Sequence, residues 1–385
     1  MYRTTEQVDS NLPYSVNAHD NLNIIKIATF NLCNYLAPPD AFYDFENIYS
    51  KAQWDKKQAW IQAYLAEQQP DIIGFQEVFS VESLKALVLQ AGYPYFSAID
   101  KPNVIDDYIY DSPVVAVASR FPITDAAAIL PEPTLNAPLG LNDNFAFSRK
   151  PLRATIQLPQ IGPCDCYVAH FKSKRPIVSE GFSLSNTPDI SAFDPAVDDF
   201  RSQILGQWAS TQQRVAEAAQ LLNSIWLRKM ESEYPVILMG DFNDELETSG
   251  LHHLLADGGR HKKAAFSDAI SQRYRLQHSW PLFQASLCHR EARDWEANES
   301  VDDLAELSMP VTIKRPAPYT YYYGAVGMVL DYILLSGEFD PSFNESLAEV
   351  YDYHLYDRHL ISPCYDIDSH STDHAIVMVT VRIRQ

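Results

Sequence analysis

Short apolar runs rich in β-branched residues recur along the chain, and most are bounded by polar stretches or by Gly and Pro. Runs of this length and composition are typical of buried or half-buried strands. The predicted strands lie at 24–30, 71–78, 113–119, 152–158, 165–171, 235–241, 328–336 and 375–383. The spacing of the runs predicts a chain rich in sheet.

Three segments show the helical spacing of apolar positions instead. The segment 54–67 has this spacing and is followed by Pro70, a second segment lies at 81–88, and a third runs from Arg201 to about Lys229. Residues 176–199 are rich in Ser, Asp and Pro, so we expect a surface loop there, and 251–318 looks like a long polar insertion. With no internal repeat and no linker, all 385 residues are expected to form one domain.

The net charge of −20 argues against a broad basic surface that binds phosphate backbones. A polyanionic substrate therefore has to be bound locally. The basic run Lys172, Lys174 and Arg175 is the candidate substrate-binding segment.

The first residues lack a basic stretch followed by an apolar core, and no run is apolar enough to cross a bilayer. Five cysteines are few for this length and odd in number, so a disulfide scaffold is not expected. We expect a cytoplasmic location for the chain as it stands, with secretion as the alternative if a leader has been removed.

Polar side chains follow or precede the apolar runs at several places. They are Asn31, Glu77, His170, Asp241, Asn243, Asp331, Asp373 and His374. Taken singly, such an Asn or Asp can form a turn, a Glu can cap the next helix, and a His can be structural. Their repeated occurrence at the ends of strands favours one shared site above a sheet.

Four of these residues are carboxylates, namely Glu77, Asp241, Asp331 and Asp373. Carboxylates that are brought together repel one another unless they are paired, protonated or bound to a metal ion. Oxygen ligands without a thiolate pattern favour Mg²⁺, with Mn²⁺ or Ca²⁺ as alternatives. We therefore expect a divalent cation at this site.

Seven motifs occur in an order that resembles the endonuclease/exonuclease/phosphatase superfamily. They are ATFNLCNY, GFQEV, SRFP, VAHFKS, ILMGDFND, LDYILLS and STDHAIV. The resemblance spans nearly the whole chain and implies an α/β four-layer sandwich, with two mainly antiparallel sheets packed face to face and helices outside. It also implies metal-dependent attack of water on a phosphoester.

The resemblance implies a role for each candidate residue. Glu77 and Asn31 would bind the metal, and Asp241 and Asn243 would orient water and phosphate. Asp331 would hold His374, and His170 would contact the phosphate. Asp373 is either a metal-facing carboxylate or a carboxylate one layer behind the metal.

Three functions remain open at this point. The HFKSKRP run and the Tyr-rich segment look more like bacterial sugar-nonspecific nucleases of the superfamily, so the first is a phosphodiesterase that cuts DNA or RNA. The second is a phosphatase or phosphodiesterase that acts on a small molecule or a lipid headgroup. The third is a binding module without activity, which the complete set of site residues disfavours.

Overall fold

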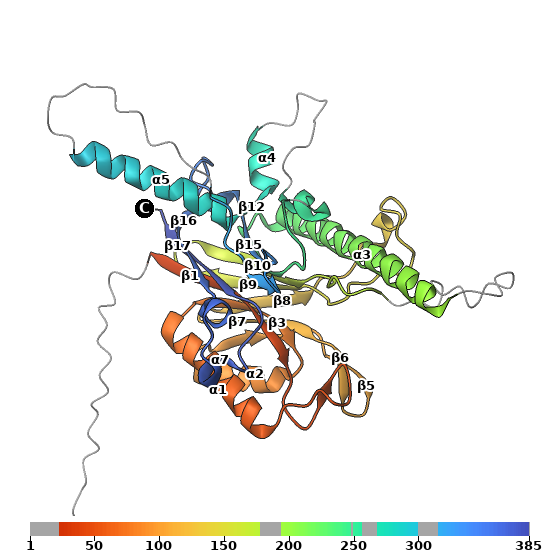
Figure 1. Ribbon diagram of the computed structural model, residues 1–385. Helices are drawn as coiled ribbons and strands as arrows, with labels where there is room; N and C mark the ends of the chain where they lie inside the picture. The colour runs from red at the N-terminus through yellow and green to blue at the C-terminus, as the bar shows by residue number, and fades with distance from the viewer. Residues whose placement is uncertain (1–22, 178–193, 248, 256–267, 299–314, 385) are drawn as a thin grey trace, which may run out of the picture.

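Two six-stranded sheets lie face to face in the computed structural model, which describes residues 23–177, 194–247, 249–255, 268–298 and 315–384 (Figure 1). Apolar side chains from both sheets fill the space between them, as Ile27 and Val117 of one sheet and Val168 and Met239 of the other do. The closeness of the sheets is evident at Gly74, where an added Cβ would lie 2.8 Å from the side chain of Met239.

The first sheet joins both ends of the described chain. In spatial order its strands are β16 (Ala348–Tyr356), β17 (Ile376–Ile383), β1 (Ile24–Tyr35), β3 (Ile72–Val78), β7 (Val114–Ser119) and β4 (Tyr95–Ser97). Only β1 and β3 run parallel, and the other neighbours are antiparallel.

The second sheet is built from the middle of the chain and from the region after it. Its strands are β12 (Leu276–His278), β15 (Asp331–Ser336), β11 (Val236–Asp241), β10 (Gly162–His170), β9 (Leu152–Leu158) and β8 (Ile123–Ala128). Here β10 and β11 form the parallel pair.

Helices cover the outer face of each sheet. On the first sheet, Trp60 and Tyr64 of α1 (Lys51–Gln68) and Leu84 of α2 (Val81–Gln90) pack against Phe30 and Phe75. On the second sheet, the apolar side of α3 (Pro195–Ser232) packs through residues such as Leu221 and Ile225. The predicted four-layer sandwich with mainly antiparallel sheets is confirmed.

Smaller elements complete the fold at its edges. They are β2 (Ala41–Phe42), β5 (Asn103–Asp106), β6 (Ile109–Ser112), the hairpin of β13 (Tyr321–Tyr323) and β14 (Val326–Met328), the helices α4 (Asp268–Tyr274), α5 (Ser279–Asn298), α6 (Arg358–Ile361) and α7 (Tyr365–Asp368), and the 3₁₀ turns Pro133–Leu135, Gly250–Leu255 and Gly337–Phe339. No described helix has the length and apolar character needed to span a bilayer.

The predicted loop and insertion differ from what the structure contains. Of the predicted loop 176–199, residues 178–193 lie outside the described residues, and α3 already begins at Pro195, where Asp194 caps it by accepting from the Ala196 N–H. Within 251–318, residues 256–267 and 299–314 lie outside the described residues, but β12 pairs with β15. Part of the predicted insertion therefore belongs to the second sheet. Its three-residue strand is too short to give a periodic signal in the sequence.

His278 on β12 provides a test of this assignment. Its side chain is 6% exposed, packs edge-on against Tyr332, and has an Nε2 atom without a hydrogen-bond partner in the described part of the chain. Burial lowers the pKa of His278 to about 3. Below about pH 6.5 the unfolded chain therefore binds a proton at His278 that the folded chain does not bind. As the pH falls from about 6.5 to about 3, the free energy of unfolding decreases by about 1.4 kcal/mol per pH unit.

We predict that His278→Leu removes this contribution. Between pH 7 and pH 5 the wild type should lose about 2 kcal/mol more stability than the variant, because only the wild type gains a proton at this position on unfolding. Urea unfolding followed by tryptophan fluorescence at both pH values measures the difference. Equal pH dependence in the two proteins would contradict the buried, neutral state of His278.

Candidate active site

Three neighbouring strands of the second sheet end or begin at one edge, and each places a polar side chain there. His170, the last residue of β10, pairs in register with Asp241, the last residue of β11. Asp241 in turn pairs with Asp331, the first residue of β15. Because β10 and β11 are parallel and β15 is antiparallel to β11, the three side chains form a row.

The glycine before Asp241 allows this row to form. Gly240 has a φ of +152°, and a Cβ on it would lie 1.9 Å from the carbonyl oxygen of Ala169 on β10. No side chain fits at that distance, so the Gly of the GDFN motif permits the close approach of the two strands. Asp241 and His170 are thereby held side by side.

The first sheet contributes Asn31 and Glu77 from inside its parallel pair. Asn31 was expected at the end of a strand, but β1 continues to Tyr35 through an irregularity at which Cys33 and Asn34 have φ values of +51° and +54°. Glu77 lies within β3 with a φ of +60°. Left-handed backbone at non-glycine residues costs of the order of 1 kcal/mol or more and persists where the surroundings enforce it.

One oxygen atom, Oδ2 of Asp241, connects the two sheets. The Nδ2 atoms of Asn31 and Asn243 each donate to it at 3.1 Å. His170 Nε2 lies 3.5 Å and His374 Nε2 4.0 Å from the same oxygen. The backbone N–H of Asn243 donates to the other carboxylate oxygen at 2.8 Å. Asp241 is 1% exposed, so its charge depends on these partners rather than on water.

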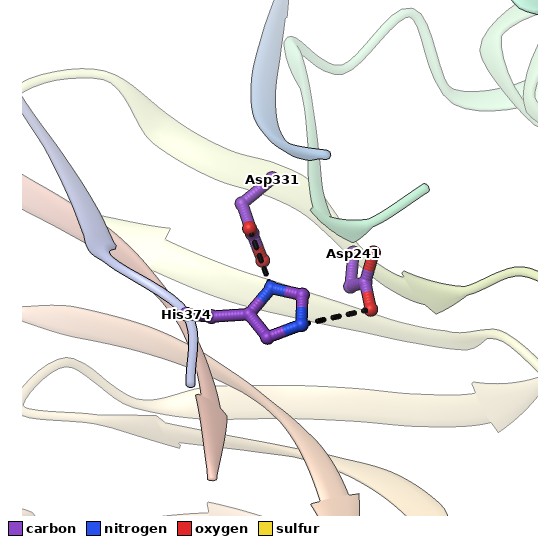
Figure 2. A group of neighbouring side chains, drawn as sticks. All are labelled: Asp241, Asp331 and His374. Atoms are coloured by element: carbon purple, nitrogen blue, oxygen red, sulfur yellow. Dashed lines mark hydrogen bonds and ion pairs between the residues drawn. The ribbon is translucent and has the colours of Figure 1, made fainter. Parts of the chain in front are cut away.

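His374 lies between two carboxylates, as Figure 2 shows. Its Nδ1 is 2.8 Å from Asp331 Oδ2, which fixes the ring orientation, and its Nε2 faces Asp241. Burial alone would lower the pKa of His374, but Asp331 and then Asp241 outweigh burial and hold the pKa well above its ordinary value. The imidazole is therefore positively charged at neutral pH.

Two residues of the row, Asp241 and His170, have pKa values shifted in opposite directions. Burial raises the pKa of Asp241, His374 opposes the rise, and Asp331 adds to it, so that the pKa lies above the ordinary range of an aspartate. Burial, followed by the charges of Arg149 and His374, lowers the pKa of His170 well below its usual value. His170 is thus a neutral imidazole beside a carboxylate and a charged imidazole.

The backbone of the STDH segment is tied to β1. Thr372 donates through Oγ1 to the carbonyl of Asn31 at 2.7 Å and accepts from the His374 N–H at 3.2 Å. The His359 ring lies 2.9 Å from the His374 carbonyl through Nε2, and the Tyr321 ring packs on the His374 ring at 4.9 Å between centroids. His374 is therefore held on its backbone and on its ring.

The residues predicted to bind a metal ion differ in their burial and in their hydrogen-bond partners. Glu77 is half-buried, and its Oε2 accepts the Asn34 N–H at 2.8 Å. Asn31 uses its amide oxygen to accept from the Cys33 N–H and directs its nitrogen at Glu77 and Asp241. Asp373 is exposed, and its charge adds to the burial that raises the pKa of the Cys33 thiol. An asparagine would bind Mg²⁺ through its amide oxygen, but here the nitrogen of Asn31 faces the carboxylates. The ligand role of Asn31 therefore stays a prediction.

The donor set fits a hard divalent cation. Asp241, Asp331 and His374 offer ligand atoms within 4.8 Å of one another, but the contact with Asp331 already occupies His374 Nδ1. Asp331 Oδ1 is buried and accepts no hydrogen bond from the described residues. The carboxylates of Glu77 and Asp241 both accept a hydrogen bond from the Asn31 amide nitrogen, and carboxylate oxygens of this kind are the ligands that Mg²⁺ prefers.

A lysine behind the acidic residues was missed by sequence reasoning. Lys57 of α1 is 1% exposed and donates to the Ser371 carbonyl at 2.7 Å. Burial lowers the pKa of Lys57, while Cys33, Asp373 and Glu77 act in the opposite direction. The ammonium group therefore lies where it balances part of the acidic charge. It is one of three lysines in this helix, and no periodicity in the sequence distinguishes it.

The predicted substrate-binding run is largely engaged within the protein. Lys172 Nζ donates to the Arg175 carbonyl at 3.0 Å, and Lys174 pairs with Asp244 at 3.1 Å. The guanidinium of Arg175 lies over the Tyr43 ring. Burial and the charge of Arg149 lower the pKa of Lys172 to about 8.

Arg149 is a second residue that sequence reasoning missed. It precedes β9, which is antiparallel to β10, so it lies at the edge where His170 ends its strand. Its charge lowers the pKa of His170 and of Lys172, and it opposes the rise that burial causes in the pKa of Tyr43. The basic SRK segment directly before a predicted strand was the signal that could have identified it.

Residues 28–349 match the model of the endonuclease/exonuclease/phosphatase family. A search of curated proteins finds no match. The fold is similar to that of the human Nocturnin catalytic domain with bound sulfate, at 16% identity and a TM-score of 0.52, covering 94% of this chain and 95% of that one.

Two further solved structures match over similar lengths. A humanized D. rerio TDP2 has 13% identity and a TM-score of 0.48, covering 93% of this chain and 99% of that one. An AP endonuclease from Archaeoglobus fulgidus has 14% identity and a TM-score of 0.44, covering 92% of this chain and 98% of that one.

The charged state of His374 can be tested without any substrate. We predict that Asp331→Asn lowers the pKa of His374, because the neutral amide no longer stabilises the imidazolium at 2.8 Å. NMR titration of histidine-labelled protein measures this pKa, and His374→Asn identifies the signal by its loss. A wild-type His374 that titrates at the ordinary histidine pKa, unchanged in Asp331→Asn, would disprove the charge assignment.

Proposed function

The chain belongs to the endonuclease/exonuclease/phosphatase family, whose members are hydrolases acting on phosphoester bonds, and we propose that it is a metal-dependent phosphodiesterase that cleaves nucleic acid. The observation that carries the proposal is the convergence of His170, Asn243 and His374 on one carboxylate, that of Asp241. Hydrolysis of a phosphoester requires an oriented water, neutralised phosphate oxygens and help for the leaving group.

Asp241 is the group that orients and deprotonates the attacking water. Its raised pKa makes it a better proton acceptor than an ordinary aspartate, which suits a general base near neutral pH. The Asn243 amide and the Asn243 backbone N–H hold the carboxylate in one orientation. A water bound to Asp241 therefore has a fixed direction of approach.

His374 and His170 would face the phosphate from the same edge. The imidazolium of His374, held by Asp331, donates a hydrogen bond to a phosphate oxygen and can supply a proton to the leaving oxygen. The neutral His170 donates one hydrogen bond without adding charge. Arg149, close to both His170 and Tyr43, would contribute a cation to the same anion.

Glu77 is the proposed principal ligand of a divalent cation, with Asp373 and Asn31 nearby as predicted from the sequence. When bound, Mg²⁺ would neutralise charge on the phosphate oxygens and stabilise the leaving group. Glu77 suits this role because its carboxylate is half-buried, accepts the Asn34 N–H, and shares the Asn31 amide nitrogen with Asp241.

A phosphoester on a small molecule or a lipid headgroup is the second candidate substrate. The observation that favours it is the internal use of the basic run, since Lys172 is bonded to its own loop and Lys174 to Asp244. A substrate with one phosphate needs only the contacts proposed for His170, His374 and Arg149. A long nucleic acid also needs cations outside the site to bind its other phosphates.

A metal-dependent turnover panel separates these functions. We predict that wild-type protein cleaves bis(p-nitrophenyl) phosphate, single-stranded DNA, RNA and plasmid with Mg²⁺ or Mn²⁺, and that EDTA and Glu77→Ala each abolish cleavage. Glu82→Ala, an exposed carboxylate on α2, is the control. Activity on phosphomonoesters or lipid headgroups alone would favour the second candidate, and no turnover of any phosphoester would exclude both.

Within that panel, Asp241→Asn and His374→Ala should each lower kcat by about 10³-fold or more, because residues that act on one reacting centre lose activity as a unit. Asp241→Asn should keep or raise thermal stability, since it removes one charge from a crowded acidic site. Near-wild-type kcat in either variant would refute the assigned roles. A melting curve for each variant shows whether a loss of activity reflects unfolding.

A further inference from the structure

Two neighbouring charged residues on α3, Arg214 and Glu217, are as buried as the site residues themselves. Their exposed fractions are 2% and 1%. Neither contacts Asp241, so the mechanism above does not use them. Lone charges of this kind are too costly to bury unless they are paired and hydrogen-bonded. Their hydrogen-bond partners therefore indicate what they do.

The carboxylate of Glu217 holds two loops that are far apart in sequence. Its Oε1 accepts the backbone N–H of Ser148 at 2.7 Å, and its Oε2 accepts the backbone N–H of Lys172 at 2.7 Å. Ser148 directly precedes Arg149, and Lys172 follows His170 by two residues. One side chain thus fixes the positions at which these two loops leave the sheet edge.

The guanidinium of Arg214 holds the second of these loops and a third one. It donates through Nη1 to the carbonyl of Lys172 at 3.0 Å, and through Nη2 and Nε to Asp244 Oδ2 at 2.8 and 3.2 Å. Asp244 directly follows Asn243, whose amide donates to Asp241. Glu217 therefore accepts a hydrogen bond from the backbone N–H of Lys172, and Arg214 donates one to its carbonyl.

We propose that Arg214 and Glu217, which we call the α3 clamp, are positioning residues that align three loops of the active site from one helix. The proposal rests on the function proposed above. Glu217 sets the loop of Arg149, which would supply a cation to the phosphate, and the loop of Lys172, which lies two residues after His170. Arg214 sets the loop of Asn243, which orients Asp241. The apolar face of α3, with Leu221 and Ile225, already attaches the helix to the sheet, so the clamp is not needed to hold α3 in place.

The chemistry of the clamp requires these residue types. A glutamine at 217 has one acceptor oxygen, so one of the two loop N–H groups loses its partner. A lysine at 214 cannot reproduce the forked contact with a carbonyl and a carboxylate. Conservative changes should therefore displace one loop at a time.

Gln220 provides a matched control on the same helix. It is 1% exposed and also tethers a loop backbone, accepting from the Glu132 N–H at 2.8 Å and donating to the Glu132 carbonyl at 3.2 Å. Glu132 lies near the start of the β8–β9 connection, whereas Ser148 and Arg149 lie near its end. Gln220→Met therefore removes comparable hydrogen bonds without touching the backbone groups that the clamp holds.

The test compares Glu217→Gln, Arg214→Lys and Gln220→Met with wild type in three measurements. These are kcat and KM on bis(p-nitrophenyl) phosphate, hydrogen exchange of residues 146–149 and 171–175, and urea unfolding. We expect Glu217→Gln mainly to raise KM and Arg214→Lys mainly to lower kcat, each with kcat/KM reduced by about 100-fold, the order of effect expected for a small misplacement of site groups. Exchange should accelerate in both segments for Glu217→Gln and in 171–175 for Arg214→Lys.

Gln220→Met should lose stability yet keep wild-type kinetics and exchange in those segments. If the clamp variants match Gln220→Met in kinetics and exchange, the clamp proposal is overturned. Absence of turnover in the wild type overturns the proposed function instead, and the exchange data then still decide whether Glu217 and Arg214 set the loops.

Discussion

The burial of two carboxylates against one imidazole is the interaction on which the rest of this structure depends. Asp241 and Asp331 are 1% and 0% exposed, and ionised groups at such depth are unstable unless positive charge and hydrogen-bond donors compensate them. The charged imidazole of His374 compensates part of this charge, and the amides of Asn31 and Asn243 solvate Asp241 in place of water. The surrounding backbone has to hold every one of these partners within a few tenths of an ångström.

The two sheets supply that rigidity through register. Strands β10, β11 and β15 place their polar residues in a row because the pairing His170 with Asp241 and Asp241 with Asp331 admits no slip without turning the apolar core outward. The remaining partners arrive where the backbone is least regular, at Glu77 and Asn243, whose φ values are +60° and +56°. Left-handed residues at a site joined by many hydrogen bonds are strain that the fold sustains to direct side chains.

Apolar runs predicted eight of the twelve strands of the two sheets but not β4, β8, β12 and β16, and the polar residues at the ends of the runs predicted most of the residues that meet, because these are local signals. The layers were predicted from the resemblance to the family. Orientation was beyond those signals. That Asn31 presents nitrogen to the carboxylates depends on the irregularity of β1, and that Lys57 lies behind Glu77 depends on how α1 packs. Lys174 was predicted to bind substrate from its charge, but its pairing with Asp244 is a tertiary contact. Local sequence identifies charges and does not identify their partners.

The distribution of charge also constrains how a phosphoester reaches the site. The chain carries a net charge of −20, and several cations near the site are already paired, as Lys174 and Arg214 are with Asp244. Attraction is therefore confined to the short range of the site, whereas the acidic surface repels phosphates that lie beyond it. Repulsion grows with the number of phosphates in the substrate, and attraction does not. For the nucleic-acid substrate proposed above, we therefore expect the end of a strand to bind more readily than a long duplex.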